Sequence, residues 1–267
     1  MKNILVPIGI SKHAEATFQY AMDVATHFES TIYVVDAYPV VLNPTSLVNV
    51  KARLEDENHQ RIKDMASLLG RGAKSIKIVR SERDLVGTVK KLNKTIGLDL
   101  IVTAPLSNNI DEKVFLDRVA GSMIKRTNIP VLVAPIEATF KEPKNILLAF
   151  KDGEIRSETT LIPLHQFQDA FESLVNLLLV KVPGYGNPNH TLSDTILSRS
   201  EELRFSENAT VYQGVLEHFQ NFKPDMLAVF KRERGFFVKL WESDVIYKKD
   251  FYCTIPLLIL KNREERI

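Results

Sequence analysis

Hydrophobic and polar residues follow two periods that alternate along the chain. Short apolar runs such as ILVPI from Ile4 and TIYVVDA from Thr31 have the length and the β-branched content of buried strands. The segment 13–28 between them repeats its apolar residues at helical spacing, on one stripe formed by Ala14, Phe18, Ala21, Val24, Ala25 and Phe28. Strands that alternate with amphipathic helices are typical of a parallel sheet with helices on both faces.

The same patterns predict the remaining elements. Further strands are expected at 75–79, 98–103, 130–134, 145–150, 176–182 and 210–213, and in DMLAVF from Asp225 and IPLLIL from Ile255. Further helices are expected at 50–69, 84–96, 112–127, 158–174 and 191–202, and in a segment that ends near Lys223. Gly70 and Gly97 follow two of these helices, where glycine commonly ends a helix.

The chain also contains an internal repeat. KNILVPIG from Lys2 returns as KNILLAFK from Lys144, after a segment that is bounded by prolines. The DLIV strand from Asp99 returns as DMLAVF from Asp225, and in both copies a proline follows the aspartate at the same interval. We therefore expect two homologous domains, at 1–140 and 142–267.

Composition narrows the class of protein. The chain has 267 residues, of which 45% are hydrophobic and 25% charged, as in ordinary soluble domains, and no apolar run approaches the roughly 18 residues of a membrane span. The net charge is +2 with both signs interspersed, which does not favour a nucleic-acid partner. Cys253 is the only cysteine, which excludes an internal disulfide and suits a reducing compartment, so we expect a cytoplasmic location.

Three stretches carry a resemblance to a known family. They are the opening ILVPIGISKHAEATFQYAMDVA, the DLIV strand, and FLDRVAGSMIKRTNIPVLVAP, in which a helix is followed by a P-V-L-V strand. These stretches resemble the universal stress protein family in its tandem two-domain form. FFVKLWESDVIYKKDFYCTIPLLIL looks like the second domain of tandem members found in Bacteroidetes.

The resemblance implies an α/β fold of two tandem, doubly wound, parallel five-stranded sheets with strand order 3-2-1-4-5. In the family, the last strands pair across a dimer or between the tandem domains, and their apolar edges here would permit either. We expect a pseudo-dimer within the chain, and the resemblance also allows a homodimer.

The nucleotide-binding branch of this family carries G-x2-G-x9-G-[S/T] after the fourth strand and an aspartate at the end of the first. Glycines let backbone N–H groups close on phosphates at a helix N-terminus. Counted from Asp99, the four motif positions fall on Ala104, Ser107, Asp117 and Arg118, and Gly9 stands at the position of the acid. All of these residue types are changed, so the first half is expected to hold a degenerate nucleotide-binding site.

The second half departs from the motif as well. Its equivalent positions are Lys151, which stands for the acid, and Phe230, Glu233, Ser243 and Asp244. A bulky phenylalanine and an acid cannot imitate a glycine nest. Lys151, Lys231 and Arg232 leave open an altered, basic nucleotide site in this half.

Gly121-Ser122 looks like a phosphate loop but lies one helical turn beyond the motif position, so we interpret Gly121 as a packing residue inside a helix. His13 opens the first helix near the strand ends, where ligands enter such sheets, and we interpret it as a residue of the helix N-terminus that binds no ligand. We interpret Cys253 as a small, semi-buried residue. No catalytic motif and no zinc-binding cysteine pair is found.

These observations favour a universal stress protein that is not an enzyme, binds no metal, needs no cofactor, and acts through protein partners or through self-association of last-strand edges. One alternative is a regulator that binds ATP or AMP at an altered site. Another is a protein that binds a different small ligand in the cleft at the strand ends.

Overall fold

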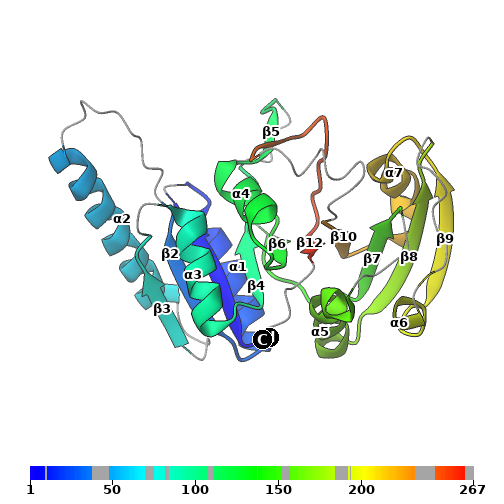
Figure 1. The fold of residues 1–267 in the computed structure, drawn as a ribbon, viewed down its shortest axis with the longest axis horizontal. Helices are drawn as coiled ribbons and strands as arrows, with labels where there is room; N and C mark the ends of the chain where they lie inside the picture. Colours follow the sequence, from blue (N-terminus) through cyan, green and yellow to red (C-terminus); the bar gives the residue numbers. More distant parts are fainter. Residues whose placement is uncertain are drawn as a thin grey trace.

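The computed structural model of the protein describes residues 1–9, 11–37, 48–69, 75–81, 84–106, 111–136, 138–151, 157–183, 192, 194–231 and 244–261. Within these ranges strands and helices alternate as the hydrophobic pattern predicts, and the chain forms one broad sheet covered by helices (Figure 1).

Five parallel strands of the first half lie in the order β3-β2-β1-β4-β6. They are β1 (Asn3–Ile8), β2 (Thr31–Asp36), β3 (Ser75–Val79), β4 (Leu100–Thr103) and β6 (Val131–Val133). The second half has the equivalent order β9-β8-β7-β10-β12. Its strands are β7 (Asn145–Phe150), β8 (Leu174–Lys181), β9 (Glu202–Glu207), β10 (Met226–Phe230) and β12 (Leu257–Leu260). The predicted order 3-2-1-4-5 is confirmed in both halves.

The last strands of the two halves pair with one another. β12 runs antiparallel to β6, with Leu257 opposite Val133 and Ile259 opposite Val131, and this pairing joins the halves into one ten-stranded sheet. Of the two pairings that the resemblance allowed, the structure has the one within the chain. β6 also pairs with β4, and β12 with β10, so neither last strand keeps a free edge for a second chain.

A second, smaller ladder connects the halves above this sheet. β5 (Val114–Leu116) pairs antiparallel with β11 (Ile246–Tyr247), with Ile246 opposite Leu116. The backbone N–H of Lys248 extends the ladder by donating to the carbonyl of Lys113 at 2.8 Å.

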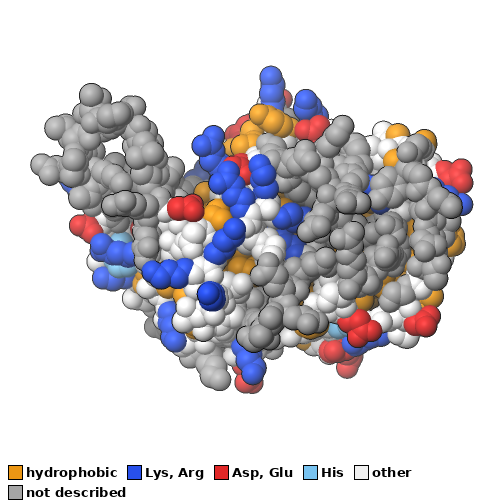
Figure 2. Space-filling view, in the orientation of Figure 1, with side chains coloured by type: hydrophobic (Ala, Val, Ile, Leu, Met, Phe, Trp, Pro, Cys, Tyr) orange, Lys and Arg blue, Asp and Glu red, His pale blue; other side chains and the backbone are white. Residues whose placement is uncertain are grey.

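Helices cover both faces of the sheet. Side chains of α1 (Ala14–His27), α2 (Val48–Leu69), α5 (Ile162–Phe171) and α6 (Asp194–Leu197) pack on the face that contains Ile4 and Val6. Those of α3 (Leu85–Ile96), α4 (Arg118–Arg126) and α7 (Val211–Phe222) pack on the face that contains Leu5, as expected where successive strand residues point to opposite sides. Lysine and arginine side chains gather outside α3 and α4 (Figure 2). None of the helices in the described ranges has the length and hydrophobicity needed to cross a membrane.

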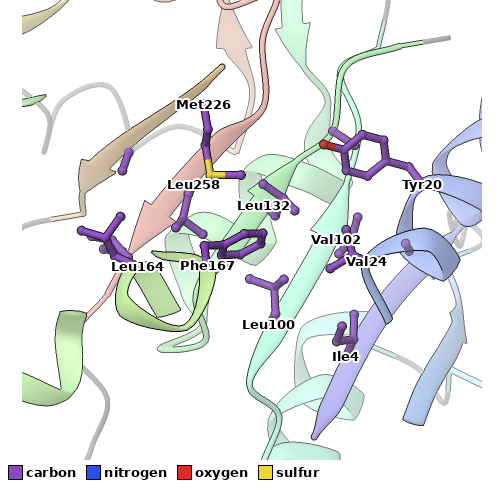
Figure 3. Packing of buried hydrophobic residues seen from close by; sticks show 14 of the residues in the cluster. Ile4, Tyr20, Val24, Leu100, Val102, Leu132, Leu164, Phe167, Met226 and Leu258 are labelled. Carbon is purple, nitrogen blue, oxygen red and sulfur yellow. The ribbon is translucent and has the colours of Figure 1, made fainter. Parts of the chain in front are cut away.

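The core on the α1 face continues from one half into the other. Figure 3 shows Tyr20, Val24 and Leu132 from the first half in one cluster with Phe167 and Leu258 from the second. In addition, the ring of Phe140, which lies between β6 and β7 in sequence, contacts Tyr20 at 5.5 Å and Phe171 at 5.6 Å between centroids. The segment that links the halves is therefore itself anchored in aromatic packing.

The predicted helix at 112–127 is wrong over its first turns. Residues Val114–Leu116 form β5, and α4 begins only at Arg118, after Asp117 in an extended conformation. The sequence VFL is β-branched and aromatic, and its partner strand β11 is more than a hundred residues away in the chain. A local pattern carries no information on such a partner.

Three predictions in the second half also need correction. The helix predicted at 158–174 is a short 3-10 turn, η1 (Glu158–Leu161), followed by α5, and Leu174 already belongs to β8. The helix predicted at 191–202 covers only α6 in the described residues, and the strand predicted at 210–213 is the start of α7, with Thr210 as its N-cap. The apolar pattern does not reveal the actual strand, β9, because it lies at the edge of the sheet and carries polar residues on its exposed side.

Candidate functional site

A cleft of about 510 Å³ opens at the carboxyl ends of β1 and β4, beside the N-terminal ends of α1 and α4. Its lining brings together four of the five predicted first-half positions, Gly9, Ala104, Asp117 and Arg118. The fifth, Ser107, lies outside the described residues. Most of the remaining lining is apolar or carries hydroxyl groups, and Lys12 and Glu112 add one charge of each sign. The cleft has the size of a small-molecule site.

Asp117 is the N-cap of α4. Its carboxylate accepts a hydrogen bond from the backbone N–H of Ala120 at 2.9 Å. Burial raises the pKa of this carboxyl, and the backbone N–H groups of Ala120 and Val119 lower it in part. The N-terminus of α4, which would face an anionic ligand, is therefore already occupied by a carboxylate of the chain itself.

The described start of the loop after β4, residues 104–106, is also unsuited to bind phosphates. Pro105 has no N–H to donate, and the N–H of Leu106 donates to the carbonyl of Phe115 in β5 at 2.9 Å. Ala104 carries a Cβ where the family motif has glycine. β5, which the sequence pattern did not reveal, thus uses a backbone donor that a glycine nest would offer to a ligand.

Gly9 is held by a group of residues that the sequence did not single out. Nη2 of Arg61 in α2 donates to the carbonyl of Gly9, and also to Oδ1 of Asn58 at 3.0 Å. Nδ2 of Asn58 in turn donates to Asp36, a buried residue at the end of β2. Asn58 and Arg61 lie three residues apart on one side of α2, which is the signal that could have suggested their common role.

Gly121 is a packing residue, as predicted. It lies within α4, and a Cβ at this position would be only 2.1 Å from the backbone oxygen of Asp244. The neighbouring Ser122 hydroxyl donates to the carbonyl of Val119 at 3.0 Å, inside the same helix. The Gly121-Ser122 pair therefore marks a close contact between the halves.

The structure describes three of the second-half positions, Lys151, Phe230 and Asp244. Phe230 is buried with its ring 6.3 Å from that of Phe150, and Lys151 is buried at the end of β7. Glu233, Ser243 and Arg232 lie outside the described residues. Asp244 lies against α4, where its carboxylate pairs with Lys125 at 3.7 Å and with Arg126.

Two lysines of the second half hold the other end of α4. Nζ of Lys261 is fully buried and donates to the carbonyls of Met123 at 2.9 Å and Thr127 at 3.2 Å. Nζ of Lys231 donates to the carbonyl of Lys125 at 2.5 Å, so this lysine is directed at α4. Burial, followed by the charge of Lys231, holds the pKa of Lys261 well below its usual value. These carbonyls are the ones that an isolated helix leaves without donors.

His13 and Cys253 do not contribute side chains to the cleft. His13 is the N-cap residue of α1 and is largely buried, while its neighbours Ser11, Lys12 and Ala14 line the cleft. Cys253 is buried, its Sγ donates to the carbonyl of Ile255 at 3.3 Å, and burial raises its pKa to about 12. Within the described ranges, no three histidine, cysteine or acidic side chains come together in a way that could hold a metal ion.

Comparisons with known proteins agree with this architecture. The family model described as the universal stress protein family matches residues 1–135, just over half of the chain. A search of curated proteins finds no match.

Solved structures of similar fold cover almost the whole chain. A universal stress protein from Archaeoglobus fulgidus DSM 4304 has 11% identity and a TM-score of 0.71, over 99% of this chain and 97% of its own. A putative universal stress protein from Pseudomonas aeruginosa UCBPP-PA14 has 15% identity and a TM-score of 0.56, over 98% and 93%. At these identities the structures establish the fold alone. The family match over 1–135, more than half of the chain, shows that the chain belongs to the universal stress protein family.

Proposed function

We propose that this universal stress protein acts in the stress response by associating with other proteins, in the cytoplasm, without binding ATP and without catalysing a reaction. The observation that carries the proposal is the position of Asp117. Its carboxylate accepts from the N–H of Ala120 at the helix end that faces the cleft. A phosphate group would have to displace this cap and would then lie beside a carboxylate.

Electrostatics and donor count support the same conclusion. Two like charges about 4 Å apart repel by roughly 4 kcal/mol at the effective dielectric constant typical of a protein surface. Pro105 has no N–H and the N–H of Leu106 is engaged, so neither of these described loop residues offers a backbone donor that could offset this repulsion. Arg118 lines the cleft but is exposed, so its charge is largely screened by water.

Titration calorimetry with ATP and with AMP tests the proposal. The wild-type protein is expected to give no saturable heat. The matched variant Asp117→Ser keeps a side chain that caps helices well and removes the negative charge, so any gain of ATP affinity in this variant would identify the charge as the cause. A stoichiometric ATP complex of the wild-type protein refutes the proposal.

The altered nucleotide site of the second half is the weaker alternative. Phe230 packs on Phe150, and Lys231 donates to a carbonyl of α4. Titration calorimetry of the variant Lys151→Ala with ATP and with AMP tests this alternative. A nucleotide site built on this lysine would lose affinity for the nucleotide in the variant.

A second candidate function is the binding of a different small ligand in the first-half cleft. The open volume of about 510 Å³ favours it, because an unused cleft is commonly filled by side chains. Analysis by mass spectrometry of small molecules released on denaturing the fresh protein tests this function. Ala104→Phe should abolish such a complex by filling the cleft, and an empty wild-type protein would count against it.

A further inference from the structure

The outer side of α3 and α4 carries a concentration of positive charge (Figure 2). The two helices contact one another on the same face of the sheet. Neither contains an aspartate or glutamate between its bounds. We call their cations the basic face, which consists of Lys90, Lys91, Lys94, Arg118, Lys125 and Arg126.

Three acids around the basic face, Asp84, Asp117 and Asp244, are already engaged. Asp84 accepts from the backbone N–H groups of Val86 and Gly87 as the N-cap of α3, and Asp117 has the same role for α4. Asp244 pairs with Lys125 and Arg126. No described carboxylate forms an ion pair with Lys90, Lys94 or Arg118, and all three of these side chains are exposed.

The spacing of the lysines in α3 lowers the stability of this helix. Lys90 and Lys94 are separated by one helical turn, and like charges at this spacing destabilise a helix. The same helix could have kept its solubility with one lysine exchanged for glutamate. Stability alone therefore does not account for the basic face, whereas an anionic partner would turn the repulsion into favourable contacts.

We propose that the basic face is the docking surface for an acidic segment of another protein. The inference rests on the proposed function, association with proteins, and names the chemistry of the partner. Charge complementarity is the argument for this occupant, because the exposed side of α3 and α4 offers lysine and arginine side chains and no large apolar group.

The surface fits other anionic partners less well. The exposed large hydrophobic side chains of the described residues lie outside α3 and α4, so the face has nothing to insert into a membrane. It likewise offers no exposed aromatic ring on which a base could stack. With a net charge of only +2, the chain attracts a long polyanion such as DNA weakly at a distance. A short acidic segment needs only the local charge.

The test is a titration of the full-length protein into a fluorescein-labelled oligoglutamate peptide, followed by fluorescence anisotropy at several salt concentrations. The wild-type protein should bind saturably, with an affinity that falls as salt is added. The double variant Lys90→Glu/Lys94→Glu should bind about tenfold more weakly, because two attractions are lost and two repulsions are gained. The matched control is Lys63→Glu/Lys141→Glu, which makes the same charge change at exposed positions outside α3 and α4 and should retain wild-type affinity.

Several results would overturn the inference. They include no binding of the peptide by the wild-type protein, or equal weakening in both double variants. Tighter binding of duplex DNA or of phosphatidylserine vesicles, reduced by Lys90→Glu/Lys94→Glu, would assign the face to another partner class. Self-association that this variant abolishes would make the occupant a second copy. Circular dichroism checks that the variants are folded. If Lys90→Glu/Lys94→Glu unfolds the chain, the milder variant Lys90→Ala/Lys94→Ala takes its place.

ATP calorimetry on the same samples separates the two proposals. A wild-type ATP complex refutes the proposed function whatever the peptide does. Loss of peptide binding refutes the basic face and leaves the conclusion on ATP unchanged.

Discussion

Replacing Gly121 with alanine should weaken the contact between the two halves. The new Cβ would lie 2.1 Å from the carbonyl oxygen and 2.5 Å from the carbonyl carbon of Asp244, both of which are backbone atoms. Relief requires a shift of more than an ångström in either α4 or the segment at Asp244. Overpacking of this kind commonly costs about 1–3 kcal/mol. Alanine also returns about 0.5–1 kcal/mol of helix propensity, so we expect a net loss of about 1–2 kcal/mol.

Two other helical glycines provide matched controls. At Gly214 a Cβ would lie 2.6 Å from Cγ2 of Val180, a side-chain atom that can move. At the exposed Gly87 it would lie 3.0 Å from Oδ2 of Asp84, the end of a flexible side chain. The expected order of destabilisation is therefore Gly121→Ala, then Gly214→Ala, then Gly87→Ala, which should be close to neutral.

Thermal and urea unfolding measure these differences. For a chain of this size, each kcal/mol corresponds to about 2–4 °C in Tm, so Gly121→Ala should lower Tm by roughly 2–8 °C. If Gly121→Ala were as stable as Gly87→Ala, the backbone of Asp244 would not lie against α4, and the explanation of this glycine would be wrong.

Further predictions follow from the caps and the buried groups. Thr210→Ala removes the side chain that accepts from the N–H of Gln213, and should cost about 1 kcal/mol of unfolding free energy in urea titrations, whereas Thr210→Ser should not. Because the folded pKa of Lys261 is lowered, the unfolded chain binds more protons, so the wild-type protein should gain stability as pH rises towards 10.5. Lys261→Met should lose this gain, and parallel stability–pH curves for the two proteins would contradict the assignment. The Cys253 thiol, with its pKa raised to about 12, should not react with a disulfide reagent at pH 8 until the protein is denatured, and rapid reaction of the native protein would show that it is accessible.

Much of the candidate site could be placed from the sequence because the motif register is local. The carboxyl ends of β1 and β4 follow apolar runs that can be recognised one by one, and parallel strands bring these ends to the same edge of the sheet. Gly9, Ala104, Asp117 and Arg118 therefore meet around one cleft, as the register predicts. Arg61 could not be placed in this way, because its contact with Gly9 depends on how α2 packs against the sheet at β2 and β3.

The sequence by itself determined the α/β class and the repeat, since short apolar runs and amphipathic helices are signals of neighbouring residues, whereas the strand order was implied by the resemblance to the family. It also determined that Gly121 lies within a helix and lacks the register of a phosphate loop. Only the tertiary structure decided which residues oppose one another across the halves: β5 with β11, Asp244 with Gly121, and Lys261 with the end of α4. These contacts join segments that are more than a hundred residues apart. The spacing of apolar residues within a strand or a helix carries no information about such distant partners. The physical reason is that a pattern records which face of an element is buried, whereas the partner that buries it is set by packing of the whole chain.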